Sequence, residues 1–182
     1  VSTGGVVTSL GVVAATAAWE TEPQIAARGT QALVVWQSAT DIRGSIFNGT
    51  SFGAAFTVAA TAATERDPAI VANPAGNYLV SFGDDTNIDL YGQFVTSAGA
   101  LSGASFPISL ASGSQFHSSV AFAGGNFIAA WANTATGQDG IYATRISTAG
   151  AVLNTRLDAD GLTTVGGIAI ALPGGKPNNS SI

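Results

Sequence analysis

The stretch that decides the fold is "GNYLVSFGDDTNIDLYGQF", residues 76–94, in which two strand-like runs flank an acidic turn. A closely similar stretch, "GNFIAAWANTATGQDGIYATRI", occupies residues 125–146. Both contain aromatic and β-branched runs, typical of strands, bounded by Gly, Asn and Asp, which favour turns. The chain therefore contains an internal repeat that we expect to form antiparallel strands.

Three copies of this unit can be aligned. Repeats A, B and C occupy residues 22–47, 66–95 and 116–146. Trp36, Phe82 and Trp131 fall at one position of the alignment, 46 and 49 residues apart. The period is therefore near 48 residues, which is the size of one supersecondary unit in a repeat protein.

The two ends of the chain match parts of the same unit. The phrase "VSTGGVVTS" at residues 1–9 is similar to "VTSAGALSG" at 95–103, and "GIAIALPGGK" at 167–176 is similar to the start of repeat B. We therefore predict one repeat domain over residues 1–182. Its parts are the end of a split repeat (1–20), repeat A (21–64), repeat B (65–114), repeat C (115–164) and the start of a further repeat (165–182).

Each unit is expected to contain four short strands. In repeat B these are residues 68–72, 77–82, 88–95 and 104–110. The Ala-rich stretch 14–19 has helical propensity, but the repeat register places it opposite a strand, so we predict a strand there too. Four strands in about 40 to 50 residues is the size of a β-propeller blade. The predicted fold is all-β, a propeller-like array of four-stranded antiparallel blades.

The repeats also share a recognisable pattern. In repeat B it is carried by Pro68, Ile70, Gly76, Tyr78, Leu79, Val80, Asp89, Leu90, Tyr91 and Gly92. In repeat A it is carried by Pro23, Ile25, Ala26, Leu33, Val34, Trp36, Asp41, Ile42 and Gly44. This pattern resembles the Pro-x-Ile-Ala, Gly-x-Tyr-Leu-Val-x-Trp and Asp-Ile-Tyr-Gly repeats of secreted bacterial β-propeller-type proteins. Repeat C departs from it at Ser118 and Ala143. The resemblance implies an architecture and leaves the activity open, because such repeats occur in enzymes, adhesins and binding modules.

Blades must stack, because one blade cannot bury both of its faces. Trp36, Phe82 and Trp131 are therefore expected to lie between adjacent blades.

Three complete units and two partial ones are too few for most closed propellers, which usually hold about four to eight blades. The ends could meet within one chain, two chains could share split blades in a ring of about seven or eight, or the chain could belong to a larger propeller. A contact that fails to close would give a filament. We favour self-association or a larger propeller, because a lone ring would lack the middle strands of its split blade.

The composition excludes several classes of function. Hydrophobic residues make up 46% of the chain and charged residues 9%, with six basic residues that are scattered and a net charge of −5. Because nucleic-acid binding depends on clustered Lys and Arg, we expect no nucleic-acid partner, and the apolar runs are too short and interrupted for membrane insertion. The absence of Cys removes disulfides and thiolate chemistry. The chain has no Met and starts at Val1, for which a cleaved signal peptide and a shortened chain are the two explanations.

The acidic turn of repeat B is the candidate metal site. Asp84, Asp85 and Asp89 lie close together in the sequence. Clustered carboxylates suit Ca²⁺, which prefers six to eight oxygen ligands. No Asp-x-Asp-x-Asp-Gly loop is present, however, so we favour the alternative that these residues form turns. No other cofactor is expected.

No residue set amounts to a catalytic signature. His117 is the one histidine, near Ser118 and Ser119 in the sequence, but a catalytic triad needs convergence that sequence does not show. Glu20, Glu22, Glu65 and Asp67 precede the first strands of two repeats at matched positions, which indicates a structural role.

The candidate ligand-binding residues are Trp19, Tyr91 and Tyr142, interpreted as exposed aromatic rings that could stack on sugars. Tyr91 and Tyr142 recur at one repeat position. Recurrence is expected either from one glycan pocket per blade or, as we favour, from packing. We predict an extracellular structural or binding module that self-assembles or recognises glycans. The alternative is a fragment or subunit of a larger secreted β-propeller glycoside hydrolase or polysaccharide lyase.

Overall fold

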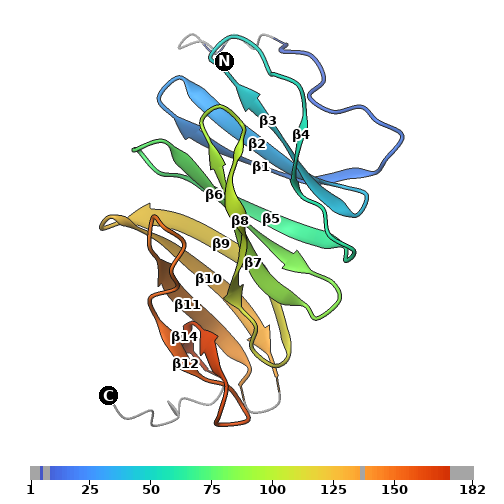
Figure 1. The fold of residues 1–182 in the computed structure, drawn as a ribbon. Coiled ribbons are helices and arrows are strands. Elements are labelled where there is room, and N and C mark those ends of the chain that lie inside the picture. Colours follow the sequence, from blue (N-terminus) through green and yellow to red (C-terminus); the bar gives the residue numbers. More distant parts are fainter. Residues whose placement is uncertain (1–4, 6–8, 136–137, 173–182) are drawn as a thin grey trace.

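The acidic turn of repeat B joins the two central strands of a four-stranded antiparallel sheet. A computed structural model describes residues 5, 9–135 and 138–172, and within them the chain forms fourteen strands and no helix. Twelve of these strands form three four-stranded sheets (Figure 1). The predicted all-β fold of four-stranded antiparallel blades is confirmed.

The first two sheets are simple meanders, in which strands that follow one another in the chain pair antiparallel. The first contains β1 (Glu20–Arg28), β2 (Gln31–Ser38), β3 (Asp41–Phe47) and β4 (Phe56–Ala59). The second contains β5 (Glu65–Ala72), β6 (Asn77–Asp84), β7 (Asp89–Thr96) and β8 (Leu101–Ser109). The four strands of the second sheet correspond to those predicted for repeat B.

The third sheet differs at its outer strand. It begins with β9 (Ser114–Ala123), β10 (Asn126–Thr134) and β11 (Gly140–Ile146), and its fourth strand is β14 (Ile168–Ala171). Between them, β12 (Thr155–Leu157) and β13 (Thr164–Gly166) form a separate two-stranded ribbon.

Strand β14 occupies the place that β8 occupies in the second sheet. Ile141 pairs with Ala171 and Ala143 pairs with Ile168, as Leu90 pairs with Ser109 and Gly92 with Phe106. The repeat register assigns residues 168–171 to the first strand of a further unit. They complete the third sheet instead, and the predicted further repeat over residues 165–182 stays a prediction because residues 173–182 lie outside the described part.

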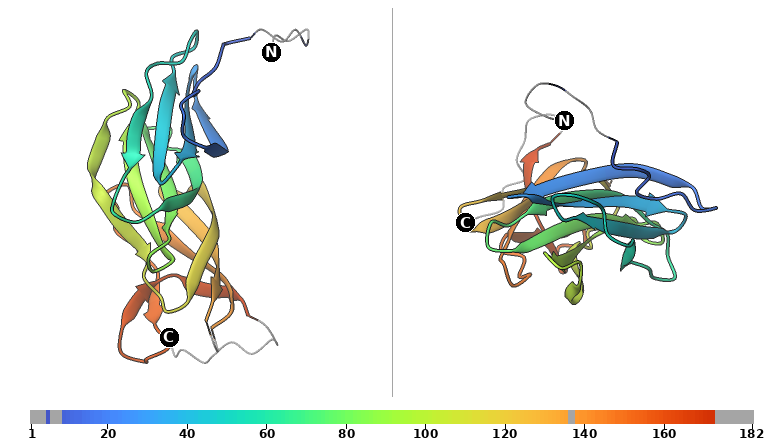
Figure 2. Two further views of the ribbon diagram at one scale, coloured as in Figure 1. Left: turned by 90° about the vertical axis from the view of Figure 1, so that its right-hand side faces the viewer. Right: turned by 90° about the horizontal axis from the view of Figure 1, so that it is seen from above.

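The sheets stack in the order of the sequence, with the second between the first and third (Figures 1 and 2). Their first strands lie side by side, β1 against β5 and β5 against β9. Phe82 belongs to a core between the first and second sheets, together with Leu33, Val35, Ile42, Val58, Tyr78 and Val80. Trp131 belongs to a core between the second and third sheets, together with Leu79, Leu90, Phe94, Ile108 and Phe127. These two aromatic residues lie between blades, as expected.

Two local expectations are corrected by the structure. Trp36 is buried, but Leu33 and Val35 of the same strand face the second sheet, so strand alternation turns Trp36 to the opposite face. Residues 14–19 form neither a strand nor a helix. No helix long and apolar enough to cross a membrane occurs among the described residues.

Candidate functional site

The strand arrangement gathers the carboxylates at one end of the three sheets. Because the strands are antiparallel, the starts of β1, β5 and β9 lie beside the β2–β3, β6–β7 and β10–β11 turns. Backbone hydrogen bonds join these parts across neighbouring sheets, from Glu65 N to Thr40 O (2.9 Å) and from Gln115 N to Ile88 O (2.8 Å).

We call this end the acidic end. Of the eleven acidic residues of the chain, nine lie there in the strand starts and the turns within the sheets: Glu20, Glu22, Asp41, Glu65, Asp67, Asp84, Asp85, Asp89 and Asp139. Asp158 joins them, because its Oδ2 accepts a hydrogen bond from Ser112 N just before β9. In the described part of the chain, the connections at the opposite end carry no Asp or Glu, whereas Arg28 and Arg145 lie toward it. The two ends therefore differ strongly in charge.

The first strand of every sheet has a bulge near the acidic end. At the bulge a residue other than glycine adopts a left-handed backbone: Glu22 (φ 54°), Asp67 (φ 49°) and His117 (φ 53°). The pairing register shifts beside each of them. Such a conformation costs on the order of 1–3 kcal/mol and is concentrated at binding and catalytic sites. Three matched bulges that each present an ionisable side chain therefore mark a candidate site, which we call the bulge row.

One hydrogen bond links two members of the bulge row, and another joins β9 to β6 beside the third. The backbone N–H of Asp67 donates to Glu22 Oε2 at 3.0 Å. The Ser118 and Ser81 hydroxyls share a hydrogen bond of 2.9 Å beside His117. The ring of Phe116 meets the imidazole of His117 edge-on, with ring centres 5.1 Å apart. The row therefore runs over three neighbouring first strands rather than lying in one blade.

Behind the row, the first residue of β5 has a structural role. Glu65 is 1% exposed, and its Oε1 accepts hydrogen bonds from the Thr61 backbone N–H (2.9 Å) and the Thr61 hydroxyl. Glu20 repeats this arrangement with the Thr16 hydroxyl at 2.5 Å, a bond that lowers the pKa of Glu20. The matched positions thus contain two kinds of carboxylate, one anchoring the chain before each strand and one in the bulge row.

Two carboxylates of the acidic turn have partners of their own, and the third lies opposite one of them in the strand pair. Asp84 Oδ1 accepts from Thr86 N at 2.6 Å, as in a turn, and Asp85 Oδ1 lies 2.7 Å from Arg66 Nε. Asp89 is 8% exposed and pairs directly with Asp84, so that burial first, and the Asp84 charge second, raise the pKa of Asp89. Among the described residues, no three His, Cys, Asp or Glu side chains gather as metal ligands, and calcium binding here stays a prediction.

Two of the candidate sugar-stacking rings lie against aromatic core residues. Tyr142 is 3% exposed and stacks on Trp131, with ring centres 6.4 Å apart, while the Arg156 guanidinium covers it at 4.4 Å. Tyr91 is half-buried and stacks on Phe82 at 6.2 Å. Burial raises the pKa of both phenols. The expectation that Tyr142 is exposed is therefore wrong.

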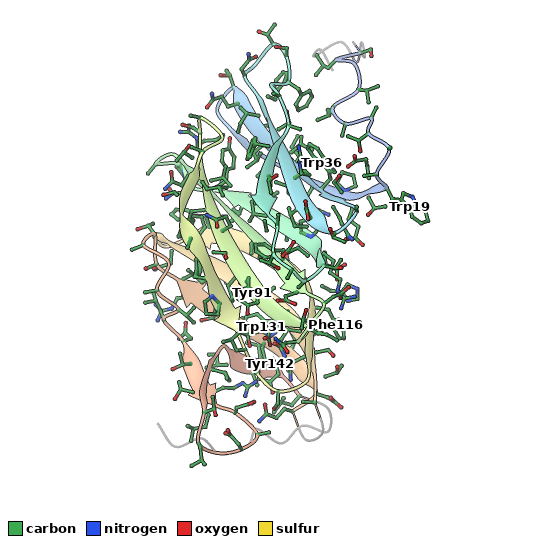
Figure 3. All side chains as sticks on the ribbon, turned by 45° about the vertical axis from the view of Figure 1, so that its right-hand side comes forward. Trp19, Trp36, Tyr91, Phe116, Trp131 and Tyr142 are labelled. Atoms are coloured by element: carbon green, nitrogen blue, oxygen red, sulfur yellow. The ribbon has the colours of Figure 1, made fainter. Side chains whose placement is uncertain are left out.

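Trp19 is the candidate ring that faces solvent. It is 84% exposed and points away from the ribbon directly before β1 (Figure 3). It lies next to Glu20 and therefore at the acidic end. A role in ligand binding stays a prediction for Trp19 and Tyr91.

Sequence reasoning did not identify the bulge row as a unit. Glu22 and Asp67 were recognised at matched positions, and His117 was considered separately as a lone histidine. The signal that joins them is their spacing of 45 and 50 residues, which is one repeat period each. Left-handed backbone at these positions is a tertiary feature that residue type alone does not predict.

No protein family and no curated protein matches the sequence, but solved structures share its fold. The GH43 endo-arabinanase from Bacillus licheniformis superposes with a TM-score of 0.54 and 13% identity, covering 84% of this chain and 59% of that one. A GH43 β-1,3-galactosidase gives 0.54 and 8%, covering 75% and 32%. An endo-arabinase from Bacteroides thetaiotaomicron gives 0.50 and 12%, covering 90% and 80%.

These similarities show a β-propeller fold. At 8 to 13% identity these similarities support the fold and not a function, because one fold occurs with many functions. The chain spans 59% and 32% of the first two structures.

Proposed function

We propose that this chain is a carbohydrate-binding β-propeller segment whose ligand site is the bulge row at the acidic end. The observation that carries the proposal is the placement of Glu22, Asp67 and His117 at matched left-handed bulges on three adjacent first strands. Carboxylates and imidazole hydrogen-bond to sugar hydroxyls. A row that crosses three strands offers such groups in succession, as a chain of sugar units requires.

The charge of the acidic end favours a neutral glycan. Carboxylates of Asp41, Asp84 and Asp85 lie at the same end as the bulge row, and a concentration of one charge repels ligands of that charge. Acidic polysaccharides are therefore disfavoured. The exposed indole of Trp19 supplies an aromatic face at the same end, and aromatic rings are typical of the apolar part of ligand sites.

The solved structures of similar fold suggest which glycans to try first. They include an endo-arabinanase and a β-1,3-galactosidase. Arabinan and β-1,3-galactan oligosaccharides are neutral, so they agree with the charge argument. Export from the cell, where such polymers occur, is part of this proposal, and fractionation of the producing cells tests it.

Isothermal titration calorimetry with these oligosaccharides tests the binding. We expect measurable binding by the wild type and a loss of about tenfold or more for Trp19→Ala or Asp67→Asn, since one lost ligand contact is worth roughly 1–3 kcal/mol. Leu101→Ala is the control, because Leu101 is also exposed, at 47%, but begins β8 at the opposite end of the sheets. Equal binding by all four proteins would refute the site.

Glycoside hydrolysis is a second candidate, favoured by one contact. Glu22 and Asp67 each supply a carboxylate from neighbouring strands, and the backbone N–H of Asp67 donates to Glu22 Oε2, which places the two residues next to each other. Most glycosidases use a pair of carboxyl groups, one as acid and one as base or nucleophile. Release of reducing sugar that Glu22→Gln and Asp67→Asn each abolish would support hydrolysis. Binding without any release of sugar would leave the recognition function alone.

A further inference from the structure

The third sheet has one face that nothing in the described part of the chain covers. In β6 of the second sheet every residue from Tyr78 to Gly83 is buried, as in a strand covered on both faces. In β10 buried residues alternate with half-buried ones, as in a strand covered on one face. The uncovered side is mostly apolar; we call it the rear patch, formed by Ala121, Ile128, Ala130, Ala132, Ile141 and Ala143, with the exposed Arg145 on the same face opposite Ile128.

The same face is an interface in the other two sheets. Leu79 and Leu90 occupy the positions of Ile128 and Ile141 in the second sheet, where the third sheet covers them to 0% and 1% exposure. Leu33 and Ile42 occupy these positions in the first sheet and are both 0% exposed under the second sheet.

Ile141 is instead 41% exposed. Apart from Arg145, which stands where the second sheet has Phe94, the rear patch has the composition of a blade interface without its partner. An apolar sheet face of this kind is typical of a protein contact surface.

The opposite face of the first sheet has the complementary pattern. Ile25 lies at the position of Ile70 and Val120, which pack against the preceding sheet, yet it is 63% exposed. Trp36, at the position of Phe82 and Trp131, lies on the same face, already shielded to 5% exposure by its own chain. This front face thus repeats the residue types that dock on rear faces twice within the chain.

From these two faces we infer that a second copy of the chain docks head to tail, with its front face on the rear patch. The contact would continue the stack that the chain already contains, burying Ile25 of the second copy against Ile128 and Ile141. Such a contact is heterologous, so it closes into a ring or extends into a filament according to the rotation between copies.

The proposed contact extends the bulge row. In the chain, β1 lies beside β5 and β5 beside β9, so β9 would lie beside β1 of the second copy. His117 would then have Glu22 of that copy as its neighbour, as Asp67 has Glu22 within the chain. This consequence rests on the proposed function, whereas the docking itself does not.

The test is the solution mass of the whole chain over a range of protein concentration, by light scattering after gel filtration. We expect multiples of 18.1 kDa for the wild type. Ile141→Arg blocks the rear patch and Ile25→Arg blocks the front face, so each variant alone should remain at the monomer mass. Both residues are exposed in the single chain, so the variants should fold, which circular dichroism verifies. Leu101→Arg, at 47% exposure on β8, is the control that should assemble like the wild type.

Mixing the two blocked variants gives the decisive outcome. Each retains one intact face of opposite kind, so an equimolar mixture should form a dimer and nothing larger. A wild type that stays at 18.1 kDa at every concentration would overturn the inference, and so would assembly that survives both substitutions. Sugar binding by calorimetry is measured separately on the Ile141→Arg monomer, so a failure of docking is distinguished from a failure of the proposed function.

Discussion

Thr61 donates both its backbone N–H and its hydroxyl to one carboxyl oxygen of Glu65, which is buried at the first position of β5. The bonds fix the connection between the first and second sheets. At the matched position of the third sheet, Gln115 is equally buried and donates its side-chain N–H to Ala111 O at 2.8 Å. A buried acid in one blade and a buried amide in the next therefore both hydrogen-bond the segment that precedes the first strand.

Replacing Glu65 tests whether this anchor stabilises the fold. We expect Glu65→Ala to lower the free energy of unfolding by about 1–3 kcal/mol, because the Thr61 donors lose their buried acceptor. Glu65→Gln keeps an acceptor oxygen and should cost less than about 1 kcal/mol. Urea unfolding followed by circular dichroism measures both. Equal losses for the two variants would mean that the charge, rather than the hydrogen bonds, holds the connection.

Two tryptophans at the extremes of burial should respond differently to truncation. Trp131 is 2% exposed and packs in the core between the second and third sheets, so Trp131→Ala should cost about 3–5 kcal/mol. Trp19 is 84% exposed, and Trp19→Ala should change stability by less than about 0.5 kcal/mol. Thermal unfolding of the two variants checks this order. A large loss from Trp19→Ala would show that its ring packs against the chain after all.

The third prediction concerns Gly167, which places β14 beside the third sheet. Its φ is +91°, and an added Cβ would lie 2.3 Å from the Trp131 ring. We therefore expect Gly167→Ala to detach β14 and to increase amide hydrogen exchange in residues 168–171, while the second sheet stays protected. Gly161→Ala is the matched control, since Gly161 has a φ of +69° with nothing within 4 Å of the added Cβ. Unchanged exchange in β14 with Gly167→Ala would show that the strand is held by other contacts.

The strands were predictable from the sequence because period and composition agree. Residues 77–82 are aromatic and β-branched between turn residues, and alignment with residues 126–131 predicted that Phe82 and Trp131 share an environment, which the two cores confirm. The place of residues 168–171 was not predictable in this way. Their pattern suits any strand, and only tertiary contacts decide whether they begin a new sheet or complete the third.

The candidate site was harder to predict from the sequence than the strands were. The recurrence of Tyr91 and Tyr142 favoured packing, which their stacking on Phe82 and Trp131 agrees with. The cover of Tyr142 by Arg156 was not predictable, because Arg156 comes from a segment that departs from the repeat. The bulge row was missed because a left-handed Glu, Asp or His has no signature in residue type. The sequence does show that Glu22, Asp67 and His117 are one repeat period apart. This spacing indicates a site only when the left-handed backbone at each of the three residues is known.

The buried carboxyl of Asp89 should make stability depend on pH. Burial, and then the Asp84 charge, raise the pKa of Asp89 above its ordinary value of 3.8, so the folded state binds this proton more tightly than the unfolded chain. The resulting stabilisation is complete below pH 3.8 and is lost as the pH rises through the raised pKa of the folded state.

The variant Asp89→Asn has no ionisable group at this position, so it should not lose stability in this way. Its stability relative to the wild type should therefore rise from acid toward neutral pH and then level off. Urea unfolding at several pH values measures the difference, and Asp84→Asn, which keeps the acceptor for Thr86 N, should reduce the wild-type dependence in part. Parallel curves for the wild type and Asp89→Asn would show that this carboxyl is as well solvated in the folded chain as in the unfolded one.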